Sequence, residues 1–180
     1  MRLEMILTGL LLASCLYGQN KVPNDTIHWS ESKKISWSDF KGEPQLYTGL
    51  MGEAFCMNSG YYERPNAFTK TNFKVYAVFD RTKSWINPDA KSDYGLLYFR
   101  VMFNLYEKHA RELRKELSEN NPGKDVNSFF QEKYNASMTA LSDEFNEFRN
   151  DTRMGQDKGA LLRWEKKVNE DLLGLDSYKE

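Results

Sequence analysis

The spacing of apolar residues changes from the period of a strand to the period of a helix near residue 92. Before this point, residues 73–80 show the clearest strand pattern, because every second residue from Phe73 to Phe79 is apolar and falls on one face. Residues 35–40 alternate in the same way, and residues 46–62 alternate more loosely. These patterns predict strands.

The N-terminal polar stretch and the C-terminal half complete the expected domain. Residues 15–34 indicate a tether followed by a first strand. Apolar stripes at helical spacing predict three helices, at about residues 92–119, 126–148 and 158–173. Strands followed by helices predict an α+β domain over residues 35–175, with an antiparallel sheet and about three helices.

Composition excludes several classes of function. The chain has 25 basic and 26 acidic residues, so it carries no basic field that would attract nucleic acid. Hydrophobic residues make up 40% of its 180 residues, which is enough for a sizeable core. The chain has only two cysteines and two histidines, so a structural zinc site with four Cys or His ligands cannot occur more than once.

The first residues have the pattern of an export signal. Residues 5–13 form a short apolar stretch, too short to span a bilayer, and Leu-Ala-Ser-Cys at residues 12–15 resembles a bacterial lipobox. We therefore expect residues 1–14 to be a signal peptide and Cys15 to be acylated, which would tether the domain to a membrane. The alternative is a later cut, after Gly18, and free secretion. Either way we expect an exported protein, in the periplasm, on the outer membrane or outside the cell.

Three segments resemble a known family. They are W-S-D-F-K-G-E-P at residues 37–44, V-Y-A-V-F-D-R-T-K-S-W-I-N-P at residues 75–88 and D-Y-G-L-L-Y-F-R-V-M-F-N at residues 93–104. Weaker similarity continues in D-T-R-M-G and R-W-E-K-K, so that the resemblance covers residues 35–168. The family is a bacterial domain of unknown function, described as secreted zinc-dependent proteases with a zincin-like fold.

The resemblance implies a zinc site whose residues have been replaced. The family carries H-E-x-x-H in the third segment, where two histidines one helical turn apart bind zinc and the glutamate is the general base. A third histidine comes from a later segment. Tyr98, Phe99 and Met102 stand at the positions of the first histidine, the glutamate and the second histidine, and Met154 stands at the third ligand position. We expect these side chains to fill the former cleft.

The leading hypothesis is therefore a non-catalytic homologue of a zinc protease that binds no cofactor. It would act as an exported envelope protein, either structurally or by holding a peptide or protein segment in the former cleft as an added strand. A purely structural lipoprotein is a further interpretation, in which the old cleft is solid core.

The runner-up is an active metal-dependent hydrolase with a relocated site at His109, Glu112 and Glu116, which share one helix face. A helix exposed to solvent with charge pairs between successive turns explains the same pattern more simply. Copper(I) could bind Met102 and Met154 with Met51 or Met57, but methionine commonly fills gaps in cores. For His28, a surface or strand-edge role is expected, and for Cys56, an inert, buried thiol.

Overall fold

The computed structural model describes residues 25–45, 51–66 and 69–180. The expected signal peptide, Cys15 and the first part of the strand expected at residues 46–62 lie outside this range. Among the described helices, none combines the length and the apolar character that crossing a membrane requires.

Three antiparallel strands form one sheet, in the order β1-β3-β2. β3 is the clearest strand of the sequence and occupies the centre, where Phe79 is the register partner of both Ile27 and Cys56. β1 comes from the stretch expected to hold a first strand, β2 covers most of the pattern at residues 46–62 and ends one residue later, and β3 is longer than its alternating pattern. The bounds are β1 (Thr26–His28), β2 (Gly52–Glu63) and β3 (Asn72–Ile86).

Three helices follow, and each begins with a side chain that caps its first turn. The oxygen of Ser92, Asp125 or Asp157 accepts a hydrogen bond from the backbone N–H three residues later, at 2.9–3.0 Å. The helices are α1 (Asp93–Glu119), α2 (Val126–Asp151) and α3 (Lys158–Gly174). Their bounds agree with the apolar stripes to within three residues, so the expected α+β order of sheet and helices is confirmed.

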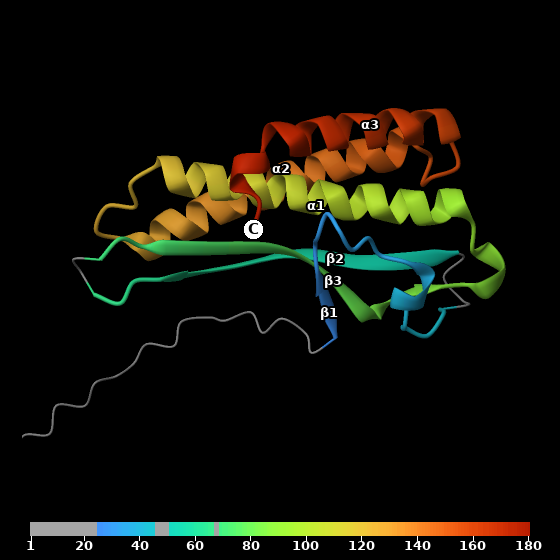
Figure 1. The fold of residues 1–180 in the computed structure, drawn as a ribbon, viewed down its shortest axis with the longest axis horizontal. Helices are drawn as coiled ribbons and strands as arrows, with labels where there is room; N and C mark the ends of the chain where they lie inside the picture. Colours follow the sequence, from blue (N-terminus) through green and yellow to red (C-terminus); the bar gives the residue numbers. More distant parts are fainter. Residues whose placement is uncertain (1–24, 46–50, 67–68) are drawn as a thin grey trace, which may run out of the picture.

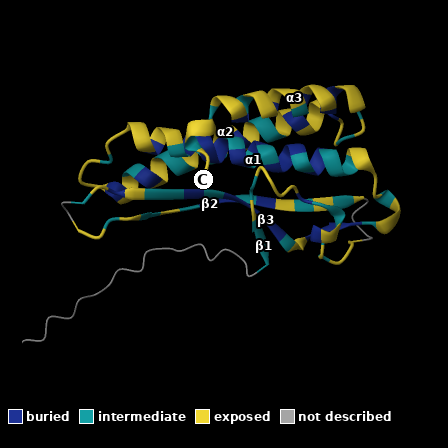
Figure 2. Cartoon of the chain, viewed as in Figure 1, coloured by how far each residue is buried: buried dark blue, intermediate teal, exposed yellow. Residues whose placement is uncertain are grey.

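The helices all lie on one side of the sheet, as Figure 1 shows. α1 contacts β3, α2 and α3 and is therefore the centre of the core. Figure 2 shows the consequence, because α1 is mostly buried or half-buried whereas α2 and α3 show exposed outer faces. The three α1 positions that align with the family's zinc motif, Tyr98, Phe99 and Met102, thus belong to the most enclosed helix of the fold.

One strand prediction is wrong. Residues 35–40 contain a short 3-10 helix, Trp37–Asp39, instead of a strand. The carboxylate of Asp39 accepts hydrogen bonds from the backbone N–H of Ser36 at 2.8 Å and from its hydroxyl at 2.9 Å. These local bonds close a turn, and they outweigh the alternating pattern. Ile35 is nevertheless buried in the core.

The second half of α1 buries an ion-pair network. Glu107 Oε1 accepts hydrogen bonds from Arg111 at 2.9 Å and from Arg114 at 2.7 Å. Arg114 also donates to the carbonyl oxygens of Val75 in β3 and Tyr178 near the C-terminus, both at 2.6 Å. Because each guanidinium finds an acceptor, the network fastens the C-terminal segment and the sheet to α1.

Candidate functional site

The three motif positions on α1 are core positions. Tyr98, Phe99 and Met102 are 9%, 8% and 4% exposed. Helical geometry places Tyr98 and Met102 one turn apart on the same face, as the resemblance requires. Burial of three large side chains stabilises the fold by roughly 1.5–3 kcal/mol each.

Tyr98 is enclosed by aromatic rings. Its ring stacks on Phe148 of α2, with centroids 4.9 Å apart, and meets Phe99 edge-on at 5.5 Å. Burial raises the pKa of the Tyr98 phenol to about 12, and the nearby charge of Arg149 opposes this only in part. The phenol therefore stays neutral and is a poor metal ligand.

Phe99 occupies the position of the general base, and its surroundings are also apolar. Its ring lies 5.1 Å from that of Phe40 and 6.1 Å from that of Trp37. A carboxylate at this position would be buried against the ring of Phe40, which offers no hydrogen-bond donor. The site is therefore built to hold an apolar side chain.

Met154 does not join this cluster, and the expectation that it fills the former cleft is wrong. It is 58% exposed and lies in the turn after α2, where Arg153, Met154 and Gly155 all have positive φ. This left-handed backbone reverses the chain between α2 and α3. The same turn does reach Tyr98, because a Cβ atom at Gly155 would lie 3.0 Å from Tyr98 Cγ. Glycine at residue 155 therefore allows the turn to pack directly against the Tyr98 ring.

These residues do not fit zinc. A catalytic zinc takes nitrogen, sulfur or oxygen from about three side chains, and the positions carry a phenol, a phenyl ring and two thioethers. Within the described residues, no group of three or more His, Cys, Asp or Glu side chains is arranged to hold a metal ion. No hydrolytic step is therefore derived for this position.

The relocated site is only partly assembled. His109 Nδ1 lies 3.2 Å from a carboxylate oxygen of Glu112, but Glu116 pairs instead with Lys133 of α2 at 2.8 Å. His109 is 4% exposed, so the expectation of a solvated helix face is wrong at this residue. It is buried because α2 covers it.

Glu144 of α2 is the partner that the sequence analysis missed. Its carboxylate lies 2.7 Å from His109 Nε2, 2.6 Å from Lys108 Nζ and 2.7 Å from Lys167 Nζ. Burial by itself raises the pKa of Glu144, but hydrogen bonds from His109, Lys108 and Lys167 outweigh it and hold the pKa well below its usual value. In the sequence, Glu144 lies one helical turn after Leu141, which belongs to the buried stripe of α2. This spacing could have indicated that Glu144 faces the core. Glu144 forms an ion-pair network with Lys108 and Lys167 at the edge of the core, and carboxylates meet both ring nitrogens of His109.

Cys56 and His28 have the roles expected of them. The Cys56 thiol is buried, and burial raises its pKa well above the usual range, so it is an inert core residue. His28 is exposed on the edge strand β1 and packs edge-on against Tyr76 at 5.1 Å. Copper binding by methionines stays an untested alternative. Met102 is buried whereas Met51 and Met154 are exposed, so their burial does not suggest a shared copper site.

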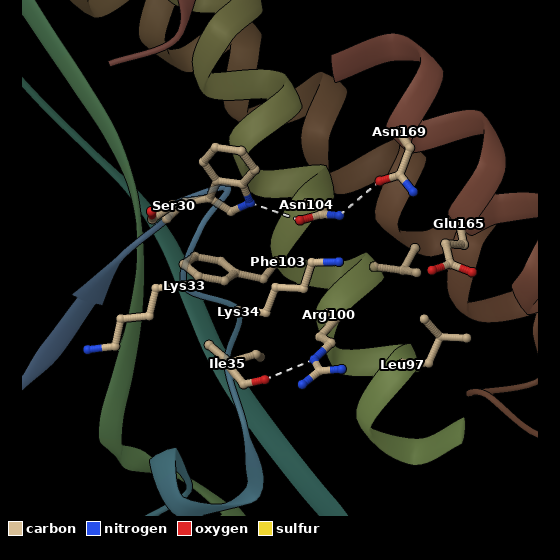
Figure 3. Close-up of a pocket in the computed structure, with 12 residues that line it drawn as sticks. Ser30, Lys33, Lys34, Ile35, Leu97, Arg100, Phe103, Asn104, Glu165 and Asn169 are labelled. Atoms are coloured by element: carbon tan, nitrogen blue, oxygen red, sulfur yellow. Dashed lines mark hydrogen bonds between the residues drawn. The ribbon is translucent and has the colours of Figure 1, made fainter. Parts of the chain in front are cut away.

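A pocket opens on another face of the same turns of α1. We call it the α1–α3 pocket. It has a volume of about 80 Å³ and lies between the segment that follows β1, the first half of α1 and α3 (Figure 3). From α1 it is lined by residues at helical spacing, Leu97, Arg100, Val101 and Asn104.

Hydrogen bonds fix the polar walls of the α1–α3 pocket. The indole Nε1–H of Trp29 donates to Asn104 Oδ1 at 2.8 Å, and Asn104 Nδ2 donates to Asn169 Oδ1 at 3.3 Å. Arg100 Nε donates to the carbonyl oxygen of Ile35 at 2.9 Å. These bonds join three segments that are distant in sequence, as the dashed lines in Figure 3 show.

A second hollow, of about 330 Å³, lies between the start of β3, the end of α1 and the C-terminal residues 177–180. Tyr98, Phe99 and Met102 line neither hollow. These two openings are therefore separate from the positions at which the resemblance implies a zinc site.

Comparison with protein-family models, with curated proteins and with solved structures finds no match to this chain.

Proposed function

We propose that this protein is an exported, non-catalytic relative of the secreted zinc-dependent proteases that its sequence resembles, and that it acts by binding a peptide or protein segment. The observation that carries the proposal is the packing of Tyr98, Phe99 and Met102 into the core of the domain. Export by residues 1–14, with a lipid on Cys15, is part of the same proposal.

The packing supports a loss of catalysis because a zinc centre needs opposite properties. Ligands and base must be polar, and one coordination position must stay open to water. Here Tyr98 is stacked on Phe148, and Phe99 lies among aromatic rings. Apolar packing thus takes the stabilising role that a metal would otherwise have.

The filled position also changes where a partner would bind. A ligand cannot enter the space that Tyr98 and Met102 occupy, so binding requires another surface. β2 forms an edge of the sheet, and an edge strand can pair with an extended peptide. The α1–α3 pocket offers a second surface, with oriented polar groups.

Metal content and proteolysis test this proposal together. The purified protein, produced without a metal-binding tag in zinc-supplemented medium, is measured for bound zinc and assayed on casein and on a peptide library, with and without chelator. We expect far less than one zinc per chain and no cleavage that the chelator abolishes.

The His109→Ala variant is the matched control for a relocated site. Because Glu144 and Glu112 already occupy both ring nitrogens, the variant should match the unsubstituted protein in zinc content and in the cleavage assay. About one zinc per chain with chelator-sensitive cleavage would contradict the proposal, and loss of that cleavage in the variant would assign it to His109.

A further inference from the structure

We propose that the α1–α3 pocket binds a carboxylate group presented by a peptide. This inference rests on the proposed function in that the domain holds its ligand without cutting it. The argument uses the charge, the hydrogen-bonding capacity and the size of the pocket.

Arg100 supplies the principal donor. Its Nε bonds to the carbonyl oxygen of Ile35, which fixes the plane of the guanidinium group. Neither terminal nitrogen has a partner among the described residues, and Arg100 lines the pocket (Figure 3). An oriented guanidinium edge with free N–H groups matches the two oxygens of a carboxylate.

Lys34 adds a second positive charge. In Figure 3 its side chain reaches across the pocket above Arg100, whereas the side chain of Lys33 points away. Neither lysine makes a hydrogen bond or ion pair within the described part of the chain. Lys34 is therefore available to a ligand beside Arg100, whereas Lys33, which also lines the pocket, directs its ammonium group away from both.

Glu165 of α3 lies on the opposite wall. It forms no ion pair with Arg100 or Lys34 in the described structure, so it does not neutralise them by contact. The lining residues Lys33, Lys34 and Arg100 outnumber Glu165, so the pocket carries an excess of positive charge that favours an anionic group such as a carboxylate. Glu165 also disfavours ligands of higher negative charge, such as phosphate groups.

Size and apolar walls narrow the ligand further. A volume of about 80 Å³ is far below the 300 Å³ or more that a drug-sized molecule needs. Leu97, Val101 and Phe103 contribute apolar surface beside the charged groups. The pocket therefore suits one carboxylate with a short apolar neighbour, as at the C-terminus of a peptide or at an acidic side chain within one.

The two sources of a carboxylate are separated by three acetylated tetrapeptides of otherwise equal composition. The first has a free C-terminal carboxylate after leucine, the second is its amide, and the third is an amide with an internal aspartate. Inorganic phosphate is the fourth probe. Binding is measured by NMR titration of the purified protein, in which the Trp29 indole N–H, bonded to Asn104 at 2.8 Å, reports on the pocket wall.

We expect saturable binding of the first or third peptide, with a shift of the Trp29 resonance, and no binding of the neutral amide. Lys34→Ala should weaken binding about threefold or more, the effect of losing one exposed charge pair. Lys33→Ala is the matched control and should leave binding unchanged. Glu165→Gln should strengthen binding, because it removes the opposing negative charge.

Several outcomes would overturn the carboxylate proposal. They are equal binding of the neutral amide, phosphate binding as tight as peptide binding, equal effects of the two lysine variants, and no saturable binding up to about 10 mM peptide. None of these would restore protease activity, so the proposed function survives them. Cleavage of the peptides in a zinc-dependent manner would instead overturn the proposed function.

Discussion

The two halves of α1 are both buried, but only the second half buries charged side chains in addition to apolar ones. The first half buries aromatic and aliphatic groups, among them Tyr98, Phe99 and Met102. The second half buries Glu107 and Arg111, which are 3% and 2% exposed. Burial alone therefore does not decide which residue types a helix carries.

The difference lies in the partners that the neighbouring elements supply. The second half faces carbonyl oxygens of β3 and of the C-terminal segment, together with the Glu144 carboxylate, and these satisfy its charged groups. The first half faces rings such as Phe40 and Phe148. A buried charge there would have no partner, which costs several kcal/mol. A bound metal is one partner that makes polar side chains tolerable in such a place, and these surroundings provide no substitute for it.

The sharpest way to break this contrast is to place a charge in the first half. Phe99→Glu introduces the carboxylate that the resemblance would place here, and we expect it to lower the free energy of unfolding by about 3–5 kcal/mol because the charge is buried without a partner. Denaturant unfolding measures the change. The control is Leu162→Glu on the exposed face of α3, with an expected change below about 0.5 kcal/mol. A loss of less than about 1 kcal/mol for Phe99→Glu would show that this half of α1 tolerates charge.

A smaller change in the free energy of unfolding is expected when a charge is removed from the second half of α1. Glu107→Gln keeps an acceptor but weakens two charge-assisted hydrogen bonds, so unfolding should become easier by about 2–3 kcal/mol. Adding Arg111→Met should cost less than the sum of the two single changes, which a double-mutant cycle measures. Glu170→Gln, in the exposed pair with Lys166, is the control and should have almost no effect. Strict additivity would show that the network is not coupled.

The smallest effect concerns the pH dependence of the ion pairs around Glu144. Its pKa is lower in the folded protein than its ordinary value of 4.5, so its contribution is present above that pH and is lost as the pH falls through the folded value. Glu144→Gln should lower the free energy of unfolding by about 1–2 kcal/mol at neutral pH. The difference should shrink steadily below about pH 4.5.

The control is Glu112→Gln, which changes an exposed partner of the same His109 and should have a smaller effect. Stability curves recorded from acid to neutral pH compare the two variants. Parallel curves for the protein and its Glu144→Gln variant would contradict the lowered pKa of Glu144.

Patterns that depend on one element were predicted well. The three helices and β3 follow from apolar spacing, since one face of each packs on the core. The inert character of Cys56 follows in the same way from its apolar run. The segment at residues 35–40 was misjudged, because the side chain of Asp39 closes a turn that an alternating pattern does not reveal.

Features that join distant elements were missed or only half found. The pairing of His109 with Glu144 spans 35 residues, so spacing within α1 directed attention to Glu112 and Glu116 instead. Met154 was assigned to the cleft by alignment alone, and the positive φ values of its turn leave it exposed. The α1–α3 pocket combines residues from the segment after β1, α1 and α3, and no single stretch of sequence contains its pattern.

The sequence by itself determined the order of strands and helices and the apolar face of each helix. These are local properties, because side-chain type and spacing set them. Only the tertiary structure decided which buried charges find partners, that Tyr98 is stacked under α2, and that Arg100 and Lys34 meet across one pocket from Glu165. Those outcomes depend on contacts between segments far apart in the chain, whose geometry exists only after the helices have packed on the sheet.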